Sequence, residues 1–176
     1  MKTPSGSHKI DIEAVLRPSR WASGMQVIGA LPDYVATQLG LTTAARSVFL
    51  HQQTVAYICE QRTLTPRDAE FVFDYMPAPI LRPMFCGAEE RGDDRRVVLA
   101  EYIKKEGRYL YVVLTVARVR GGDELWVSGA HPMSEVTLRR HLRHGRLRSV
   151  VGRTIEGGKT RTARRVTPVV AATQMP

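Results

Sequence analysis

The residues best suited to chemistry lie at the end of a strand-like run, directly in front of a strongly basic segment. The stretch "LWVSGAHPMS" (125–134) holds Ser128 and His131. An imidazole titrates close to neutral pH, so His131 is the leading candidate for a general acid or base. Its alternative is a turn histidine packed beside Pro132. Ser128 could donate a hydrogen bond to a phosphate oxygen, or it could simply end the strand.

Three arginines could complete such a site. Arg118 and Arg120 stand two residues apart in a β-rich run and should share one face. Arg62 ends a predicted helix, where it could clamp a phosphate or simply suit the helix dipole. Metal-free RNA cleavage needs a base, an acid and cations that stabilise the phosphorane. The predicted catalytic set is therefore His131, Ser128, Arg118 and Arg62, with solvated strand-end and helix-end cations as the alternative for the arginines.

Neither a metal nor a cofactor is expected. The two cysteines, Cys59 and Cys86, lie in apolar stretches and have no CxxC or Cys/His neighbours. They are predicted to be buried free thiols of a cytoplasmic protein. No run approaches the roughly 18 apolar residues of a membrane span, and no secretory segment is visible, so no membrane partner is expected.

The net charge of +9 is concentrated in one segment of the chain. Residues 135–165 hold ten Lys or Arg against two acids, whereas residues 25–134 hold twelve against thirteen. A concentrated basic block indicates a polyanionic partner, and the sequence predicts nucleic acid, with RNA preferred. The predicted nucleic-acid contacts are Arg120, Arg139, Arg140, Arg143, Arg146 and Arg148.

Most of these arginines lie in "SEVTLRRHLRHGRLR" (134–148), which has helical spacing. Val136, Leu138 and Leu142 are expected to face the core, leaving the arginines outward together with His141 and His144. Exposed helix faces usually mix the two signs of charge, but Glu135 is the one acid in this stretch.

Aromatic residues are few in the strand-like runs. Tyr109, Tyr111 and Trp126 alternate there, and either core packing or base stacking would suit them, with core packing preferred.

The remaining pattern predicts an α+β fold. N-terminal helices are expected to pack on a small antiparallel sheet meander, followed by the basic C-terminal helix and a tail. The helices are predicted over 31–40, 51–62 and 65–76. The strands are predicted over 80–86, 95–105, 108–120 and 125–130, with a short β-like run at 47–50. Thr65, Pro66 and Asp68 give the clearest helix start, with N-cap, first-position proline and capping-box acid.

One domain is expected between two less ordered ends. Residues 1–24 read as a flexible arm, 25–150 as a single α+β nuclease-like domain, and 151–176 as a basic, disordered tail.

The order of elements over residues 41–147 resembles the barnase, EndoU, colicin and RelE-like nuclease superfamily, in particular its phage-encoded branch. The resemblance lies in "SVFLHQQTVAYICEQR", in "TPRDAEFVFDYMPAPI" with its proline-containing entry to a strand, and in "LWVSGAHPMS". It implies a phage or toxin protein that cuts RNA without metal. RNA-cutting members of this superfamily often carry a histidine near the end of the first motif helix, where this chain has Arg62.

Two functions therefore stay open. The first is a metal-independent ribonuclease, and the second is a non-catalytic module that binds nucleic acid or protein, such as a phage-encoded inhibitor or a nucleic-acid-binding phage component. A protein partner or inhibitor is accordingly the alternative to RNA. Convergence of His131, Arg118 and Arg62 on one cleft would favour catalysis.

Overall fold

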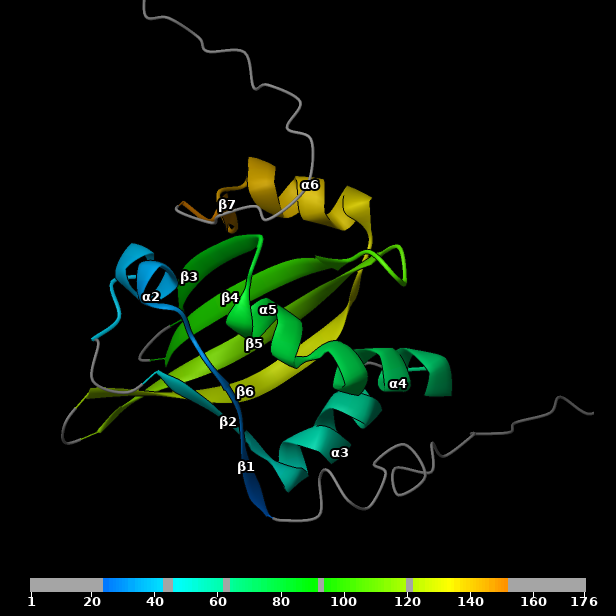
Figure 1. Ribbon diagram of the computed structural model, residues 1–176, viewed down its shortest axis with the longest axis horizontal. Helices are drawn as coiled ribbons and strands as arrows, with labels where there is room; N and C mark the ends of the chain where they lie inside the picture. The colour runs from blue at the N-terminus through cyan, green and yellow to red at the C-terminus, as the bar shows by residue number, and fades with distance from the viewer. Residues whose placement is uncertain (1–23, 43–45, 62–63, 92–93, 120–121, 152–176) are drawn as a thin grey trace, which may run out of the picture.

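A seven-stranded mixed sheet forms the centre of the protein (Figure 1). The computed structural model describes residues 24–42, 46–61, 64–91, 94–119 and 122–151. The strand order is β1-β2-β6-β5-β4-β3-β7, and every neighbouring pair is antiparallel except β2–β6, which is parallel. The strands are β1 (Met25–Ala30), β2 (Ser47–His51), β3 (Phe85–Arg91), β4 (Asp94–Ile103), β5 (Arg108–Val119), β6 (Gly122–Met133) and β7 (Arg148–Ser149).

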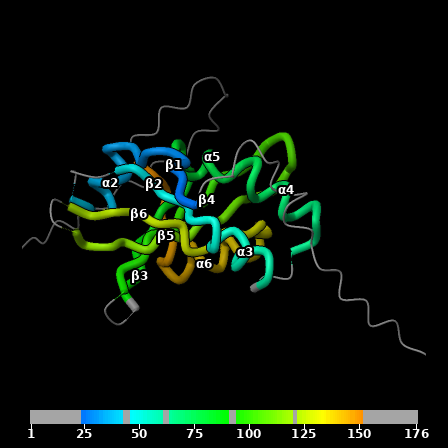
Figure 2. Tube along the Cα trace, turned by 90° about the horizontal axis from the view of Figure 1, so that it is seen from below, coloured from blue at the N-terminus to red at the C-terminus, as the bar shows by residue number. Residues whose placement is uncertain are grey.

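Helices cover both faces of this sheet. Four of them contribute to the larger core on one face, and the fifth packs on the opposite face, so that α5 and α6 lie on opposite sides of β4 and β5 (Figure 2). The helices are α2 (Asp33–Gln38), α3 (Gln52–Gln61), α4 (Pro66–Tyr75), α5 (Pro77–Leu81) and α6 (Glu135–Arg143). Within the described ranges no helix has the length and apolar character needed to cross a membrane.

The alternation of side chains along the strands divides the core in two. Leu110, Val112 and Leu114 of β5 point into the larger core with the α2–α5 helices. Tyr111, between them, points to the opposite face and joins a smaller core with Leu138 of α6. Because side chains alternate along a strand, one strand supplies both cores. The smaller core consists of Val98, Ala100, Tyr111, Met133, Leu138 and Leu147.

The predicted architecture of N-terminal helices on a small antiparallel meander is wrong. β1 precedes every described helix, β2 lies between α2 and α3, and the parallel β2–β6 pair makes the sheet mixed. The antiparallel pairing of β4, β5 and β6 agrees with the expectation, as does the presence of helices within 31–40, 51–62, 65–76 and after Ser134. "MQVIGA" lacks strict alternation, and its strand conformation depends on pairing with β2, as expected for context-dependent β-propensity.

The boundary between α5 and β3 also differs from the prediction. Residues 80–86 were expected to be a strand, yet Pro77 begins the short helix α5, a position that proline favours. Residues 87–91, for which no strand was predicted, belong to β3. Glu89 and Glu90 of β3 lie opposite Arg96 and Arg95 of β4, and such opposite-charge pairs stabilise adjacent strands.

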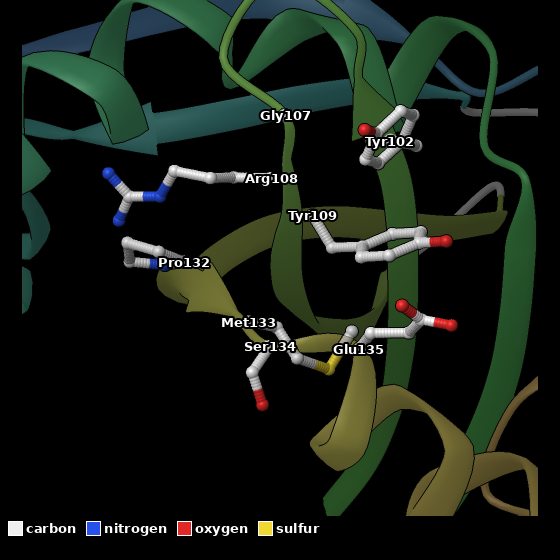
Figure 3. Close-up of a pocket in the computed structure, with 8 residues that line it drawn as sticks. All are labelled: Tyr102, Gly107, Arg108, Tyr109, Pro132, Met133, Ser134 and Glu135. Atoms are coloured by element: carbon white, nitrogen blue, oxygen red, sulfur yellow. The ribbon is translucent and has the colours of Figure 1, made fainter.

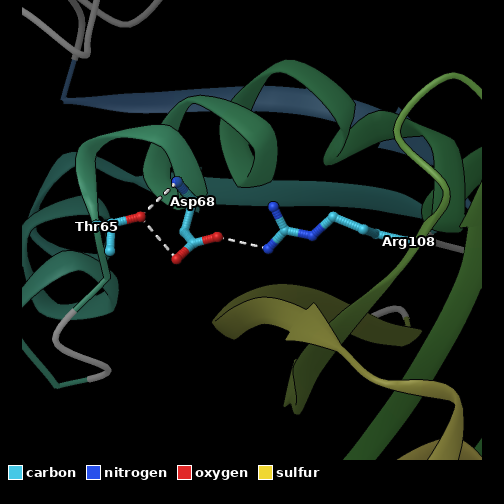
Figure 4. Close-up of polar contacts among 3 residues, drawn as sticks. All are labelled: Thr65, Asp68 and Arg108. Atoms are coloured by element: carbon cyan, nitrogen blue, oxygen red, sulfur yellow. Dashed lines mark hydrogen bonds and ion pairs between the residues drawn. The ribbon is translucent and has the colours of Figure 1, made fainter.

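The predicted start of α4 is confirmed. The Thr65 hydroxyl accepts a hydrogen bond from the Asp68 N–H at 3.2 Å and donates one to the Asp68 carboxylate at 2.8 Å (Figure 4). Arg108 of β5 donates to the same carboxylate at 2.5 Å and lies over the Phe71 ring. The hydrogen bond from Arg108, more than the bond from Thr65, holds the pKa of Asp68 below its usual value. This contact ties α4 to the sheet.

Both ends of α6 are capped by local hydrogen bonds. The Ser134 hydroxyl accepts from the Thr137 N–H at the start. At the end, Gly145 has a φ of 68° and the Arg146 N–H donates to the His141 carbonyl at 3.0 Å, which is a Schellman arrangement. The chain then runs against β3, where a Cβ on Gly87 would lie 1.9 Å from the Arg146 carbonyl oxygen.

We expect Gly87→Ala to lower the free energy of unfolding by about 2 kcal/mol or more, because backbone rather than a flexible side chain meets the new methyl group. Urea denaturation would measure the change. Gly129→Ala is the matched control, since its Cβ would make only an ordinary 3.8 Å contact with Val113. If the two variants lose the same stability, the contact between the segment after α6 and β3 is not a constraint.

Candidate nucleic-acid interface

Ser128 occupies a β-bulge within β6. Val113 of β5 pairs with Gly129, while the next residue, Leu114, pairs with Val127, so Ser128 is the extra residue. Its hydroxyl donates to the Val113 carbonyl at 3.3 Å. The side chain therefore closes an irregularity in the ladder, and the strand does not end there as the sequence suggested.

His131 lies within β6, and the expectation that it follows the end of a strand is wrong. The strand continues to Met133, and His131 pairs with Tyr111 of β5. Pro132 is tolerated because β2 pairs with β6 at Leu125 and Trp126, and among the described residues no strand pairs with the end of β6 on that side. The His131 and Tyr111 rings have centroids 5.0 Å apart.

His141 of α6 approaches the same tyrosine, with its ring centroid 5.4 Å from that of Tyr111. The prediction that His141 points outward and Val136 inward is wrong, because Val136 is 76% exposed. Leu138 is the buried residue of α6, and His141 follows it by three residues on the same helix face. The Nδ1 atom of His141 is buried and has no hydrogen-bond partner among the described residues.

Burial is the main cause that lowers the pKa of His141, followed by the nearby Arg146 and Arg140 guanidinium groups and by His144. Glu89 of β3 acts in the opposite direction. His141 therefore favours the neutral imidazole near neutral pH, in which one ring nitrogen can accept a proton.

The predicted catalytic residues do not converge. His131 pairs with Tyr111, whereas Arg118 pairs with Asp123 near the far end of the same two strands. Seven residues along β5 separate the two positions, roughly 24 Å, and the odd number of steps places them on opposite faces. Arg62 and Arg120 lie outside the described residues.

The arginines of α6 and of the segment after it are exposed. Arg139, Arg140 and Arg143 are exposed on the helix, and Arg146 and Arg148 are exposed just after it. Within the described part of the chain, Arg139 is the one of these that forms an ion pair, to Glu135 at 2.6 Å. We name these five arginines the basic ridge. The four other than Arg139 have no acidic partner among the described residues, and this concentration of positive charge favours a polyanion.

A pocket of about 500 Å³ adjoins the start of α6 (Figure 3). Four segments meet there, namely the end of β4, the start of β5, the end of β6 and the first turn of α6. It is lined by Tyr102, Gly107, Arg108, Tyr109, Pro132, Met133, Ser134 and Glu135. The Arg108 side chain extends to one side, whereas the Tyr109 ring and the Glu135 carboxylate lie on the other.

Sequence reasoning did not select this pocket. Tyr109 was expected to be a core residue, yet it is half-buried at the pocket and its ring contacts that of Tyr102 at 4.9 Å. Tyr111 is buried, as the core interpretation predicted, and Trp126 stacks on Phe49 at 5.1 Å. The available signal was the "EYIKKEGRYLY" hairpin, whose tight turn brings Tyr102 opposite Tyr109.

The two cysteines are buried and free, as predicted. Burial raises the pKa of the Cys86 thiol to about 11 and also raises that of Cys59. In the ranges that the structure describes, no group of three or more His, Cys, Asp or Glu residues is placed to hold a metal ion.

Comparisons with protein-family models, with curated proteins and with solved structures each gave no match. The resemblance to the barnase, EndoU, colicin and RelE-like superfamily stays a prediction. The function is therefore inferred from the residues of this chain.

We expect the stability of the protein to fall as the pH drops below about 6.5, in part through His141. Folding lowers the pKa of His141 below about 6.5. At pH values between this lowered pKa and about 6.5, the folded chain therefore binds fewer protons at His141 than the unfolded chain does, and lowering the pH favours unfolding. His141→Phe should flatten this part of the curve, as measured by urea denaturation between about pH 7.5 and 5. His144→Gln, which keeps His141, should retain it. An unchanged slope in His141→Phe would contradict the assignment.

Proposed function

We propose that this protein docks nucleic acid along the basic ridge, with RNA as the form that the family resemblance implies. The observation that carries the proposal is the exposure of five arginines on and after α6, with a single ion pair to an acid among the described residues. Guanidinium groups bind phosphate oxygens through two parallel N–H donors, which makes arginine well suited to this contact.

The local structure of α6 supports this use. Capping at Ser134 and Gly145 fixes the length of the helix, and Leu138 anchors it to the sheet. Arg139 and Arg143 follow each other by one turn on the exposed face, and a depression of about 560 Å³ lies among Val136, Arg139, Leu142 and Arg143. The cations are therefore presented by a rigid element, so less side-chain and backbone order has to be gained on binding.

Replacing two of these arginines tests the docking surface. Arg140→Gln with Arg143→Gln should weaken RNA binding and lower the slope of log K against log salt by about 1.4 to 1.8, since each lost phosphate contact removes about 0.7 to 0.9. Fluorescence anisotropy at several salt concentrations measures both quantities. Arg67→Gln with Arg82→Gln is the control, because both arginines are exposed and lie in or next to helices on the other face of the sheet.

Equal slopes for the two double variants would show that binding follows net charge alone. Absence of binding by the wild-type protein at low salt would refute nucleic-acid docking altogether.

A second candidate is metal-independent RNA cleavage, favoured by the placement of His131 and His141 against the same ring, that of Tyr111, at centroid distances of 5.0 and 5.4 Å. One imidazole would take the proton of the ribose 2′-hydroxyl, and the other would protonate the leaving 5′-oxygen. The 2′-oxygen attacks phosphorus while the bond to the 5′-oxygen breaks, leaving a cyclic phosphate and a 5′-hydroxyl. Arg118 has no part in this version, because it lies at the far end of the sheet.

His131→Ala should then lower the cleavage rate by about 100- to 10,000-fold while leaving RNA affinity nearly unchanged, because general acid–base catalysis has that magnitude. Gel analysis of end-labelled transcripts in the presence of EDTA gives the rate. His51→Ala replaces a half-buried histidine of β2 and serves as the control. If the wild-type protein binds RNA but does not cut the transcripts, the cleavage proposal is refuted and only RNA binding is supported.

A further inference from the structure

The pocket at the start of α6 combines an aromatic wall with hydrogen-bonding groups. The Tyr102 and Tyr109 rings lie in contact, 4.9 Å apart, at an interplanar angle of 51°. Pro132 and the buried Met133 extend the apolar lining, and Glu135 places its carboxylate beside the Tyr109 side chain (Figure 3). The volume of about 500 Å³ falls within the range of about 300 to 1,000 Å³ that small-molecule sites show.

The chemistry of the pocket selects a neutral ligand with N–H donors. The start of a helix usually attracts anions, but the Glu135 carboxylate occupies this one and would repel a phosphate. A carboxylate only accepts hydrogen bonds, and Arg139 donates to its Oε1 atom, so Oε2 remains for another donor. Burial and the neighbouring Glu135 raise the pKa of Tyr109 above its ordinary value, so its phenol stays a neutral hydrogen-bonding group well beyond neutral pH.

We propose that this pocket binds one unstacked nucleobase, whose ring lies against Tyr109 and whose pairing-edge N–H groups donate to Glu135. This inference depends on the proposed docking of nucleic acid, because the phosphates next to the bound base would have to lie on the basic ridge. A strand whose base enters the pocket would leave it past Arg139, which contacts Glu135, and reach Arg143 one helical turn, about 6 Å, further on.

Binding of a base in this pocket would make the protein prefer certain sequences or structures of nucleic acid, whereas the basic ridge alone would bind any polyanion. Phosphate contacts position a nucleic acid but carry no sequence information, whereas contacts with base edges do. A stacked base in a double helix cannot reach Tyr109, so the pocket favours single-stranded or bulged RNA, where bases can turn out and stack on aromatic side chains.

The experiment compares two uridine heptamers that differ only at the central position. One carries 2-aminopurine, a fluorescent base with an amino donor, and the other carries an abasic site. Anisotropy of a terminal dye measures the affinity of each heptamer, and quenching of 2-aminopurine reports its contact with an aromatic ring. The base should improve affinity by about fivefold or more over the abasic site, given the usual contribution of base–aromatic stacking.

Three variants locate the effect. Tyr109→Leu should remove both the quenching and the preference for the base, while Tyr109→Phe should keep the quenching because the ring remains. Tyr57→Leu is the matched control, since Tyr57 is 52% exposed on α3. Thermal melting shows whether Tyr109→Leu is folded, and if it is not, the wild-type comparison of the two heptamers still decides.

Equal affinity for the two heptamers, without quenching, would overturn the base pocket while leaving phosphate docking intact. If neither heptamer binds, the docking proposal fails, and free 2-aminopurine riboside at millimolar concentration then tests the pocket by itself. Quenching of the riboside that is lost in Tyr109→Leu supports the pocket, and absence of quenching overturns it.

Discussion

The close passage of the chain after α6 over β3 is the constraint on which the candidate sites depend. The Arg146 carbonyl lies so near Gly87 that no side chain would fit between them. This contact, together with buried Leu147, fixes where α6 ends, and the Ser134 cap fixes where it begins. The position of α6 on the sheet therefore determines where three features lie: the basic ridge, the His141 ring and the pocket wall formed by Glu135.

Several local elements could be predicted from the sequence because short-range interactions determine them. The Thr65 capping box, the helix after Ser134 and the antiparallel run of β4, β5 and β6 each have a signal within a few residues. β1 and the parallel pairing of β2 with β6 have no such local signal. Their pairing joins residues far apart in the sequence. The run 47–50 therefore indicated a short strand but not its parallel neighbour, which only the folded chain supplies.

The candidate site was harder to predict, because a one-residue change in register moves a side chain to the other face. The bulge at Ser128 shifts the register of β6, and this places His131 on the same face as Tyr111. In α6 the apolar side chain of Val136 was expected to accompany Leu138 in the core, but Val136 is exposed and His141 takes that place. Packing against Tyr111 decided for the imidazole, although it leaves a buried nitrogen without a partner among the described residues.

If the protein binds nucleic acid as proposed, the inward position of His141 would link that binding to the protonation of the protein. A neutral imidazole lets α6 pack against Tyr111, while a third positive charge next to those of Arg140 and Arg146 would oppose that packing. A phosphate bound to the basic ridge would reduce this repulsion, because it places negative charge among the same arginines. Nucleic-acid binding should therefore raise the pKa of His141 and stabilise the docked helix most strongly in mild acid. By the reciprocity of linked equilibria, protonation of His141 should in turn strengthen binding for as long as α6 stays docked.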